Sequence, residues 1–379
     1  MKCNGRSAIS GERIEIEFDA AITNVDPLLN IENDDGVFLA PGFIDLQVNG
    51  FAGVDFNSPA SSHYDIRRAI SAIFSTGVTR FFPTVITGAP DAMLSALRNL
   101  ASARESLPAG QAMEAFHVEG PHISPEDGPR GAHPREWVRP PDFAEFLHWQ
   151  DAAQGHVRLV TLSPHWPGAP RYIEQITNQG VVAAIGHTRA TQDQLRAAVA
   201  AGATLSTHLG NGAGSATRTE DFIVYQLTEQ RLAASFIVDC HHLPDEFLRR
   251  ALEAKGVDCS ILVTDAVAPA LCPPGPYALG SVAVELRGDD RVTLRGGERL
   301  AGSSLRMDRA IGNVMSRAEV SLAEAVTMAT TNPARVGRVP GRLRGLQPGS
   351  RADLVRFRMD RGRVEVLETW LSGKRVYSR

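Results

Sequence analysis

The stretch from Val181 to Asn211 constrains the fold of this 379-residue chain more than any other. Two apolar runs, residues 181–185 and 203–207, are each followed closely by a histidine, His187 and His208. The residues between them have capping-box spacing and a helical apolar face. This pattern predicts a strand, a helix and a parallel strand joined by a right-handed crossover. Both imidazoles would then lie at one edge of one sheet, where they could share a metal ion.

Each histidine alone could equally be a capping or core residue. The repeated geometry favours a metal site, because parallel barrels and open sheets place their sites at the carboxyl ends of strands. Six further apolar runs of strand length precede or follow the pair, at residues 43–47, 78–84, 113–118, 157–163, 234–238 and 260–264. Helical patterns separate most of the eight runs, which predicts a (β/α)₈ barrel of the TIM type. A doubly wound open sheet is the alternative.

The two ends of the chain have β-like patterns. Residues 1–40 and 341–379 each contain strand candidates, but neither set can bury a face alone. We therefore expect them to pair into one small β-sandwich domain, with the barrel occupying residues 41–340 between them. After the eighth predicted strand, residues 280–298 indicate a hairpin around Gly288, and two helical patterns follow.

Polar residues follow most of the predicted barrel strands. They are Asp45, Gln47 and Asn49 after the first strand, Glu119 after the third, His187 and His208 after the fifth and sixth, Asp239 and His242 after the seventh, and Asp265 after the eighth. In a barrel all of these would converge on one rim. Imidazole combined with carboxylate suits zinc or ferrous iron better than magnesium or calcium, and three protein ligands would leave a position for water. We expect Asp45 to brace the barrel and Asp239 to orient a neighbour.

Seven segments along the chain resemble a known family. They read PGFIDLQVNGFAGVDF, HVEGPH, GHTRAT, THLGN, VTDAVAP, AGSSL and GLQPGSRADLV. They are similar to motifs of the amidohydrolase superfamily and, more narrowly, of its N-acetylglucosamine-6-phosphate deacetylases. The resemblance covers nearly the whole chain, and the motifs occur in the family's order.

The resemblance implies a role for each matching residue. Glu119, His187 and His208 match ligands of one divalent metal, zinc or else iron, and Asp265 matches the catalytic acid/base. The matching substrate contacts are His133, Asn211, Gly212 and His242, and Arg218 is the nearest candidate for the family's phosphate-binding arginine. Gln47 and Asn49 stand where many amidohydrolases hold a second metal through His-x-His. Amides are poor zinc ligands, so we expect a vestigial second position and a single metal.

The implied reaction is removal of the acetyl group from an N-acetyl amino sugar phosphate, N-acetylglucosamine 6-phosphate in the first place. N-acetylgalactosamine 6-phosphate or another N-acyl compound is an alternative. A catalytically silent sugar-binding barrel is a third reading, which Asp265 disfavours because a binding module needs no such carboxylate. The segment GAGSATRTEDF after Asn211 departs from the family's phosphate-binding loop, and Arg218 is its nearest arginine. The family's arginine comes from a neighbouring subunit, which implies a homodimer.

Composition excludes several other classes. Hydrophobic residues make up 43% of the chain and charged residues 22%, as in ordinary globular proteins. The net charge of −4 provides no basic field for nucleic acid. We see no apolar run of membrane-spanning length and no signal-peptide pattern near Met1. Four cysteines without a CxxC pair indicate a reducing compartment. We expect a cytoplasmic protein without nucleic-acid or membrane partners.

Overall fold

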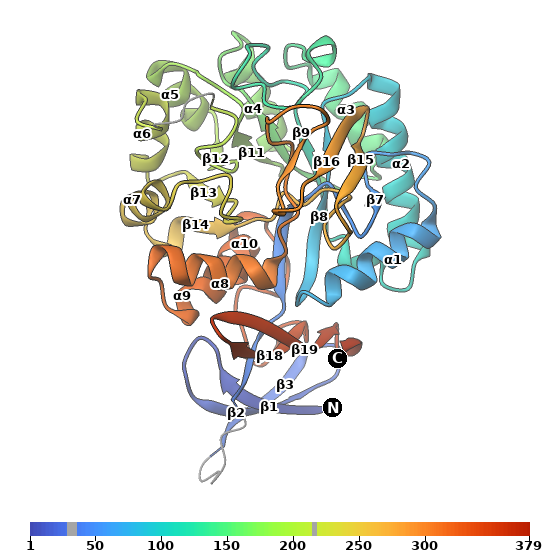
Figure 1. The fold of residues 1–379 in the computed structure, drawn as a ribbon, viewed down its shortest axis with the longest axis vertical. Helices are drawn as coiled ribbons and strands as arrows, with labels where there is room; N and C mark the ends of the chain where they lie inside the picture. Colours follow the sequence, from blue (N-terminus) through green and yellow to red (C-terminus); the bar gives the residue numbers. More distant parts are fainter. Residues whose placement is uncertain (29–35, 214–217) are drawn as a thin grey trace.

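The computed structural model describes residues 1–28, 36–213 and 218–379. A large barrel occupies the upper part of Figure 1, and a smaller β structure that contains both chain ends lies below it. This arrangement confirms the predicted (β/α)₈ barrel with a small domain built from the two termini. The division at residues 1–40, 41–340 and 341–379 stays a prediction.

The barrel strands are parallel neighbours in chain order. Within the described residues, its eight-stranded sheet contains β5 (Phe43–Val48), β8 (Val78–Ile86), β9 (Phe116–Glu119), β10 (Val157–Leu162), β11 (Val182–Ile185), β12 (Ala203–Ser206), β13 (Ala233–Phe236) and β14 (Ser260–Leu262). All eight predicted strands are confirmed, with small shifts at their ends. The residues after β14 return to β5, because the Asp265 N–H donates to Gln47 O at 3.0 Å. Asp45 braces this seam by accepting from Thr264 Oγ1 at 2.5 Å. This closure excludes the open sheet.

Helices surround the barrel (Figure 1). They are α1 (His63–Phe74), α2 (Pro90–Ser106), α3 (Phe143–Ala152), α4 (Ala169–Asn178), α5 (Gln192–Ala200), α6 (Asp221–Thr228), α7 (Asp245–Lys255), α8 (Met307–Ala318), α9 (Leu322–Ala329) and α10 (Thr331–Val336). Short 3₁₀ turns are η1 (Gly110–Ala112), η2 (Arg135–Trp137) and η3 (Val257–Cys259). The predicted capping box of α5 is present, between Thr191 and Gln194. In the described part of the chain, no helix has both the length and the apolar character needed to cross a bilayer.

Two smaller sheets lie at the carboxyl ends of the barrel strands. One pairs β6 (Gly50–Phe51) with β7 (Val54–Asp55). The other contains β15 (Gly275–Leu279), β16 (Val282–Leu286) and β17 (Val292–Leu294), and we call β15–β17 the flap. The predicted hairpin is confirmed as β16–β17, and β15 adds a strand that the sequence did not indicate. Flap residues such as Val284 belong to the same hydrophobic cluster as Ile86 at the end of β8, so the flap borders the barrel rim.

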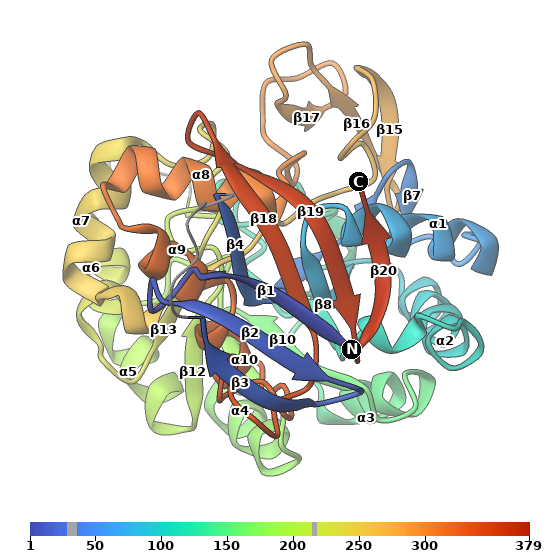
Figure 2. The same cartoon turned by 90° about the horizontal axis from the view of Figure 1, so that it is seen from below.

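The small domain is one hydrogen-bonded sheet in the order β20-β19-β18-β4-β1-β2-β3 (Figure 2). Its strands are β1 (Lys2–Ser7), β2 (Arg13–Phe18), β3 (Ile22–Pro27), β4 (Val37–Pro41), β18 (Leu354–Asp360), β19 (Arg363–Leu371) and β20 (Lys374–Ser378). Phe18 of β2 and Trp370 of β19 are not sheet neighbours, yet their ring centroids are 6.0 Å apart. The sheet therefore folds over a core of its own, which confirms the predicted sandwich of both chain ends.

Buried ion pairs join the small domain to the amino-terminal end of the barrel. Arg80 of β8 donates from Nε and Nη2 to Asp353 at 2.8 and 3.1 Å, and Arg342 donates to Asp353 at 3.0 Å. Glu114 lies 3.4 Å from Arg80 and accepts from Arg351 at 2.7 Å. The side chains of Arg80 and Asp353 are 2% and 0% exposed. We call these five residues the interdomain ion cluster.

Candidate metal centre and active site

Three potential metal ligands meet at the carboxyl ends of three barrel strands. Glu119 ends β9, while His187 and His208 follow β11 and β12 closely. Glu119 Oε1 lies 2.8 Å from His208 Nε2 and 3.3 Å from His187 Nε2, and the two nitrogens are 3.2 Å apart. Ligand atoms on a tetrahedral zinc ion are roughly 3.3 Å apart, given bonds of about 2.0–2.2 Å. The donor types and their spacing therefore fit one divalent cation.

Surrounding contacts prepare these side chains for ligation. His187 Nδ1 donates to Pro129 O at 2.9 Å, which fixes the ring with its Nε2 directed at Glu119 and His208. Burial alone would raise the pKa of Glu119, but hydrogen bonds from the two imidazoles outweigh burial and hold that pKa well below its ordinary value. The Glu119 carboxylate is therefore ionised, as a metal ligand must be. Among the described residues, the buried His208 Nδ1 has no hydrogen-bond partner.

His133 offers a further imidazole beside this centre. Its ring centroid is 4.4 Å from that of His187, and its Nε2 is 3.9 Å from Glu119 Oε2. Glu119, His133 and His187 could thus form a second donor set. The shorter separations favour His208 as the third ligand, since its Nε2 lies 2.8 Å from Glu119 Oε1 whereas His133 Nε2 lies 3.9 Å from Glu119 Oε2. His133 Nδ1 lies 2.8 Å from Thr87 Oγ1. Burial lowers the pKa of His133 to about 3, so its imidazole is neutral.

Asp265 lies against the same centre and is held by two amides. Asn49 Nδ2 donates to Asp265 Oδ1 at 2.6 Å, and Gln47 Nε2 donates to Asp265 Oδ1 at 3.1 Å and to Glu119 Oε1 at 2.9 Å. Gln47 and Asn49 therefore turn their NH₂ groups, not oxygens, towards the carboxylates. Burial and the nearby charge of Glu119 raise the pKa of Asp265 to about 6.

His242 is oriented by Asp239, as expected. His242 Nδ1 lies 2.7 Å from Asp239 Oδ2, and the backbone N–H groups of His241 and His242 donate to Asp239 Oδ1 at 2.9 and 2.8 Å. Burial opposes ionisation of Asp239, but the charge of His242 and these hydrogen bonds lower its pKa to about 2. With Nδ1 engaged, Nε2 is the atom that His242 can offer to a ligand.

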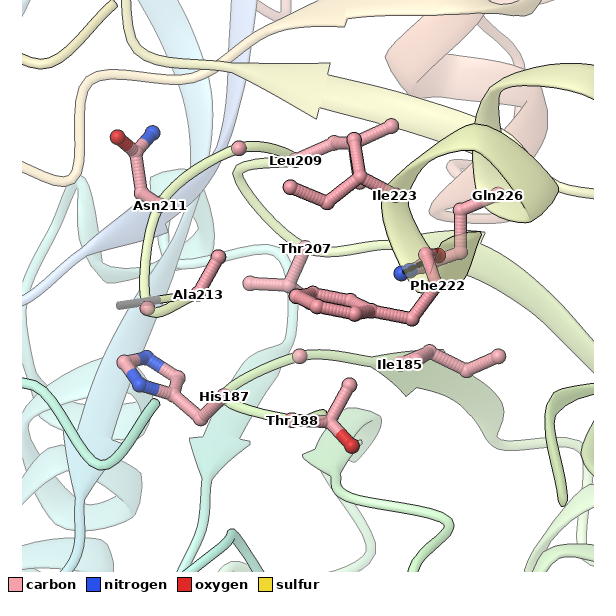
Figure 3. A pocket seen from close by; sticks show the side chains of 13 residues that line it. Ile185, His187, Thr188, Thr207, Leu209, Asn211, Ala213, Phe222, Ile223 and Gln226 are labelled. Carbon is pink, nitrogen blue, oxygen red and sulfur yellow. Dashed lines mark hydrogen bonds between the residues drawn. The ribbon is translucent and has the colours of Figure 1, made fainter. Parts of the chain in front are cut away.

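A cavity of about 490 Å³ opens beside these groups, a volume typical of small-molecule sites. Seven of the predicted site residues line it: His187, His208, Asn211, Gly212, Arg218, His242 and Asp265. Gly212 has φ +56°, and a Cβ there would lie 2.7 Å from His187 Nδ1, so a side chain would push on the imidazole. Figure 3 shows the turn that carries Leu209, Asn211 and Ala213. His187 and Asn211 lie on one side of this turn, and Phe222 of α6 lies on the other.

Arg218 lines the cavity of its own chain, whereas the resemblance implied an arginine from a neighbouring subunit. Its Nε donates to Gly210 O and its Nη2 to His242 O, both at 2.8 Å. The guanidinium also lies 5.8 Å from the Phe247 ring centroid. Residues 214–217, which belong to the divergent GAGSATRTEDF segment, lie outside the described residues.

Three contacts of the site were missed in the sequence. Thr87 follows β8, and a search of every strand end for polar residues would have found it. Pro129 contributes through its carbonyl oxygen, which has no signature in residue type. Arg299 follows the flap, lines the cavity and donates to Gly131 O at 3.1 Å. Nothing in the local sequence pattern distinguishes Arg299 from neighbouring surface arginines.

Comparison with known proteins agrees with this geometry. The Amidohydrolase family model matches residues 38–376. An N-acetylgalactosamine-6-phosphate deacetylase of Escherichia coli O157:H7 is 33% identical, across 94% of this chain and 92% of the relative. An N-acetylglucosamine-6-phosphate deacetylase of Bos taurus is also 33% identical, across 90% and 84%.

A solved structure extends the likeness to the fold. It is the N-acetyl-D-glucosamine-6-phosphate deacetylase of Mycobacterium smegmatis, a mutant of which was solved in complex with N-acetyl-D-glucosamine-6-phosphate. That chain is 29% identical, with a TM-score of 0.89 and coverage of 100% of this chain and 99% of the other. The chain therefore belongs to the amidohydrolase family and, within it, to the group of N-acetylglucosamine-6-phosphate and N-acetylgalactosamine-6-phosphate deacetylases.

Proposed function

We propose that this protein hydrolyses the acetamide of an N-acetylhexosamine 6-phosphate, releasing acetate and the amino sugar phosphate. N-acetylglucosamine 6-phosphate is the first candidate substrate. The observation that carries the proposal is the placement of Asp265. Its carboxyl shares the Gln47 amide with the potential metal ligand Glu119 and borders a cavity large enough for a sugar phosphate.

Glu119, His187 and His208 are proposed to hold one divalent cation, zinc in the first place and iron as the alternative. Two imidazoles and one carboxylate suit either ion. When bound, such an ion supplies Lewis-acid chemistry, which makes water nucleophilic near neutral pH and polarises a carbonyl group. Gln47 and Asn49 are proposed to mark a vestigial second-metal position that holds no ion.

The chain's own residues divide the remaining work. Asp265 accepts the proton of the attacking water and passes it to the leaving nitrogen. A pKa of about 6 keeps Asp265 mostly ionised near pH 7 yet easy to protonate. His133 or His242 donates a hydrogen bond to the oxygen on which negative charge develops. Asn211, Gly212 and Arg218 contact the sugar phosphate from the loop beyond β12.

N-acetylgalactosamine 6-phosphate is the second candidate substrate. The Escherichia coli relative named for that activity is 33% identical over 94% of this chain, which supports keeping both epimers. A homodimer and a cytoplasmic location complete the proposal. Four free cysteines support a reducing compartment, and light scattering tests the dimer.

One assay tests the proposed reaction. Acetate release is measured with N-acetylglucosamine and N-acetylgalactosamine, each with and without the 6-phosphate, on protein of known metal content. We expect turnover with at least one of the phosphorylated sugars at one metal equivalent per chain. Metal-loaded, folded protein that releases acetate from neither phosphorylated sugar would refute the proposal.

A further inference from the structure

Arg299 brings a second guanidinium to the cavity, from a different element than Arg218. It follows β17, where a hydrogen bond from Leu294 N to Arg299 O at 2.8 Å holds the turn. Its Nη1 donates to Gly131 O at 3.1 Å. The flap and the loop that carries His133 thus meet through this side chain at the cavity wall.

The contact with Gly131 brings the Arg299 guanidinium close to His187, one of the proposed metal ligands. A Cβ built on Gly131 would lie 3.3 Å from His187 Cε1, so the Gly131 backbone packs directly against the proposed metal ligand. The guanidinium of Arg299 is therefore separated from the His187 ring by a single residue. Arg299, His187 and Asp265 line the same cavity, so one ligand bound there can contact all three.

The two arginines that line the cavity differ in how many of their N–H groups are already hydrogen-bonded. Arg218 already directs two nitrogens at backbone carbonyls. Within the described residues, Arg299 makes no ion pair with a carboxylate. Asp127, on the same loop as Gly131, is paired with Arg130, and the charge of Arg299 contributes less than Arg130 does to lowering the pKa of Asp127. The only carboxylate that lines the cavity in the described part is Asp265. Arg299 therefore brings excess positive charge to the cavity wall.

We propose that Arg299 binds the phosphate group of the substrate and selects phosphorylated over unphosphorylated sugars. This inference rests on the proposed function, because it assigns the anionic part of that substrate to a residue. A guanidinium has five N–H donors in a planar fork that matches phosphate. Only one of these is used on Gly131, and the others remain available for phosphate oxygens. Arg218 contributes its charge from the loop beyond β12.

Kinetics of Arg299→Gln test the assignment. We expect KM for the phosphorylated sugar to rise roughly ten- to a hundredfold with kcat unchanged, the value of one charge-assisted contact. Turnover of the unphosphorylated sugar should not change, and Arg299→Lys should recover part of the loss. Arg295→Gln is the matched control, since Arg295 follows the same strand, is exposed and does not line the cavity. Equal losses with both sugars would mean that Arg299 only braces Gly131, and would overturn the proposal.

A binding measurement separates this inference from the reaction itself. Calorimetry with inorganic phosphate and with glucosamine 6-phosphate needs no turnover. Weaker binding of both to Arg299→Gln than to the unmodified protein supports the phosphate site even if no acetate is released. Unchanged binding of both overturns the site even if the protein is an active deacetylase.

Discussion

Two clusters of buried charged side chains lie at opposite ends of the barrel, and their construction differs. In the interdomain ion cluster, Asp353 accepts from Arg80 and Arg342, and Glu114 pairs with Arg80 and Arg351. At the rim, by contrast, the ligand atoms of Glu119, His187 and His208 point at one another. Among the described residues, buried Asn49 Oδ1, His208 Nδ1 and Asn211 Nδ2 have no hydrogen-bond partner there.

Three of the rim residues also have an unusual backbone conformation. His187, His208 and Asp265 have φ values of 49°, 31° and 50°, a region that costs free energy for residues with a side chain. Such strain and unmet hydrogen-bonding capacity are typical of sites that wait for a ligand. The carboxyl end of the barrel therefore carries chemistry, while the amino-terminal end carries stability. Substitutions at the two ends should separate these properties.

Asp265→Asn should give the largest effect at the rim. Loss of positioned acid/base catalysis should lower kcat by roughly 10²–10⁴-fold, because the amide cannot accept the proton. Metal content and melting temperature should stay near those of the unmodified protein. Near-normal acetate release by this variant would remove Asp265 from the mechanism.

Metal analysis of three histidine variants tests which histidines at the rim bind the metal. His187→Ala and His208→Ala should each lose most of the bound metal together with activity, since each removes a ligand. His133→Ala should keep its metal and lose activity only. A metal-free His133 variant alongside a metal-loaded His208 variant would establish the alternative donor set.

Asp353→Ala tests the opposite end. Removing the carboxylate leaves Arg80 and Arg342 buried without their partner, which should lower the free energy of unfolding by about 3–5 kcal/mol. Denaturant unfolding measures this loss, while metal content of the remaining folded protein should not change. Asp193→Ala is the control, because its side chain is 91% exposed in a surface pair and its removal should matter little. Equal stabilities of the two variants would contradict the division between the ends.

Gly212→Ala should weaken metal binding by roughly 10–100-fold, a loss typical of disturbing a group that orients a ligand. The added Cβ would lie 2.7 Å from His187 Nδ1 and displace the ring. Gly155→Ala is a matched control, because φ there is +77° but nothing lies within 4 Å of the new Cβ. Competition with a metal chelator measures the affinity. Similar affinities in both variants would show that the loop yields without moving His187.

Asp239→Asn should have the smallest effect, and that effect should depend on pH. The folded pKa of Asp239 is about 2 against an ordinary 3.8, so its stabilisation is complete above about pH 4 and fades as pH falls towards 2. The unfolding free energy of the unmodified protein should exceed that of the variant by about 2 kcal/mol above this range. The difference should shrink in a His242→Gln background. A difference that grows on acidification would have the wrong sign for an ionised Asp239.

Short-range patterns in the sequence predicted most of the fold. Apolar runs of strand length with helical patterns between them indicated all eight barrel strands, because burial on both faces of a parallel strand is a local property of the chain. The capping box at Thr191 was predicted for the same reason. Polar residues directly after strands then predicted Glu119, His187, His208 and Asp265 as one group, since parallel strands place their carboxyl ends on one rim.

The tertiary structure alone decided the partners of individual side chains. Arg80 and Asp353 are 273 residues apart in sequence, and Arg299 and Gly131 are 168 apart. Such pairs form only when barrel closure and the folding of both chain ends bring distant backbone together, so neither residue's neighbours carry a signal for the other. Asn49 illustrates the limit: its place at the rim follows from strand position, but its bond to Asp265 depends on the seam between the first and last strands. Side-chain orientation across that seam is set by packing around the whole barrel, which no local stretch of sequence contains.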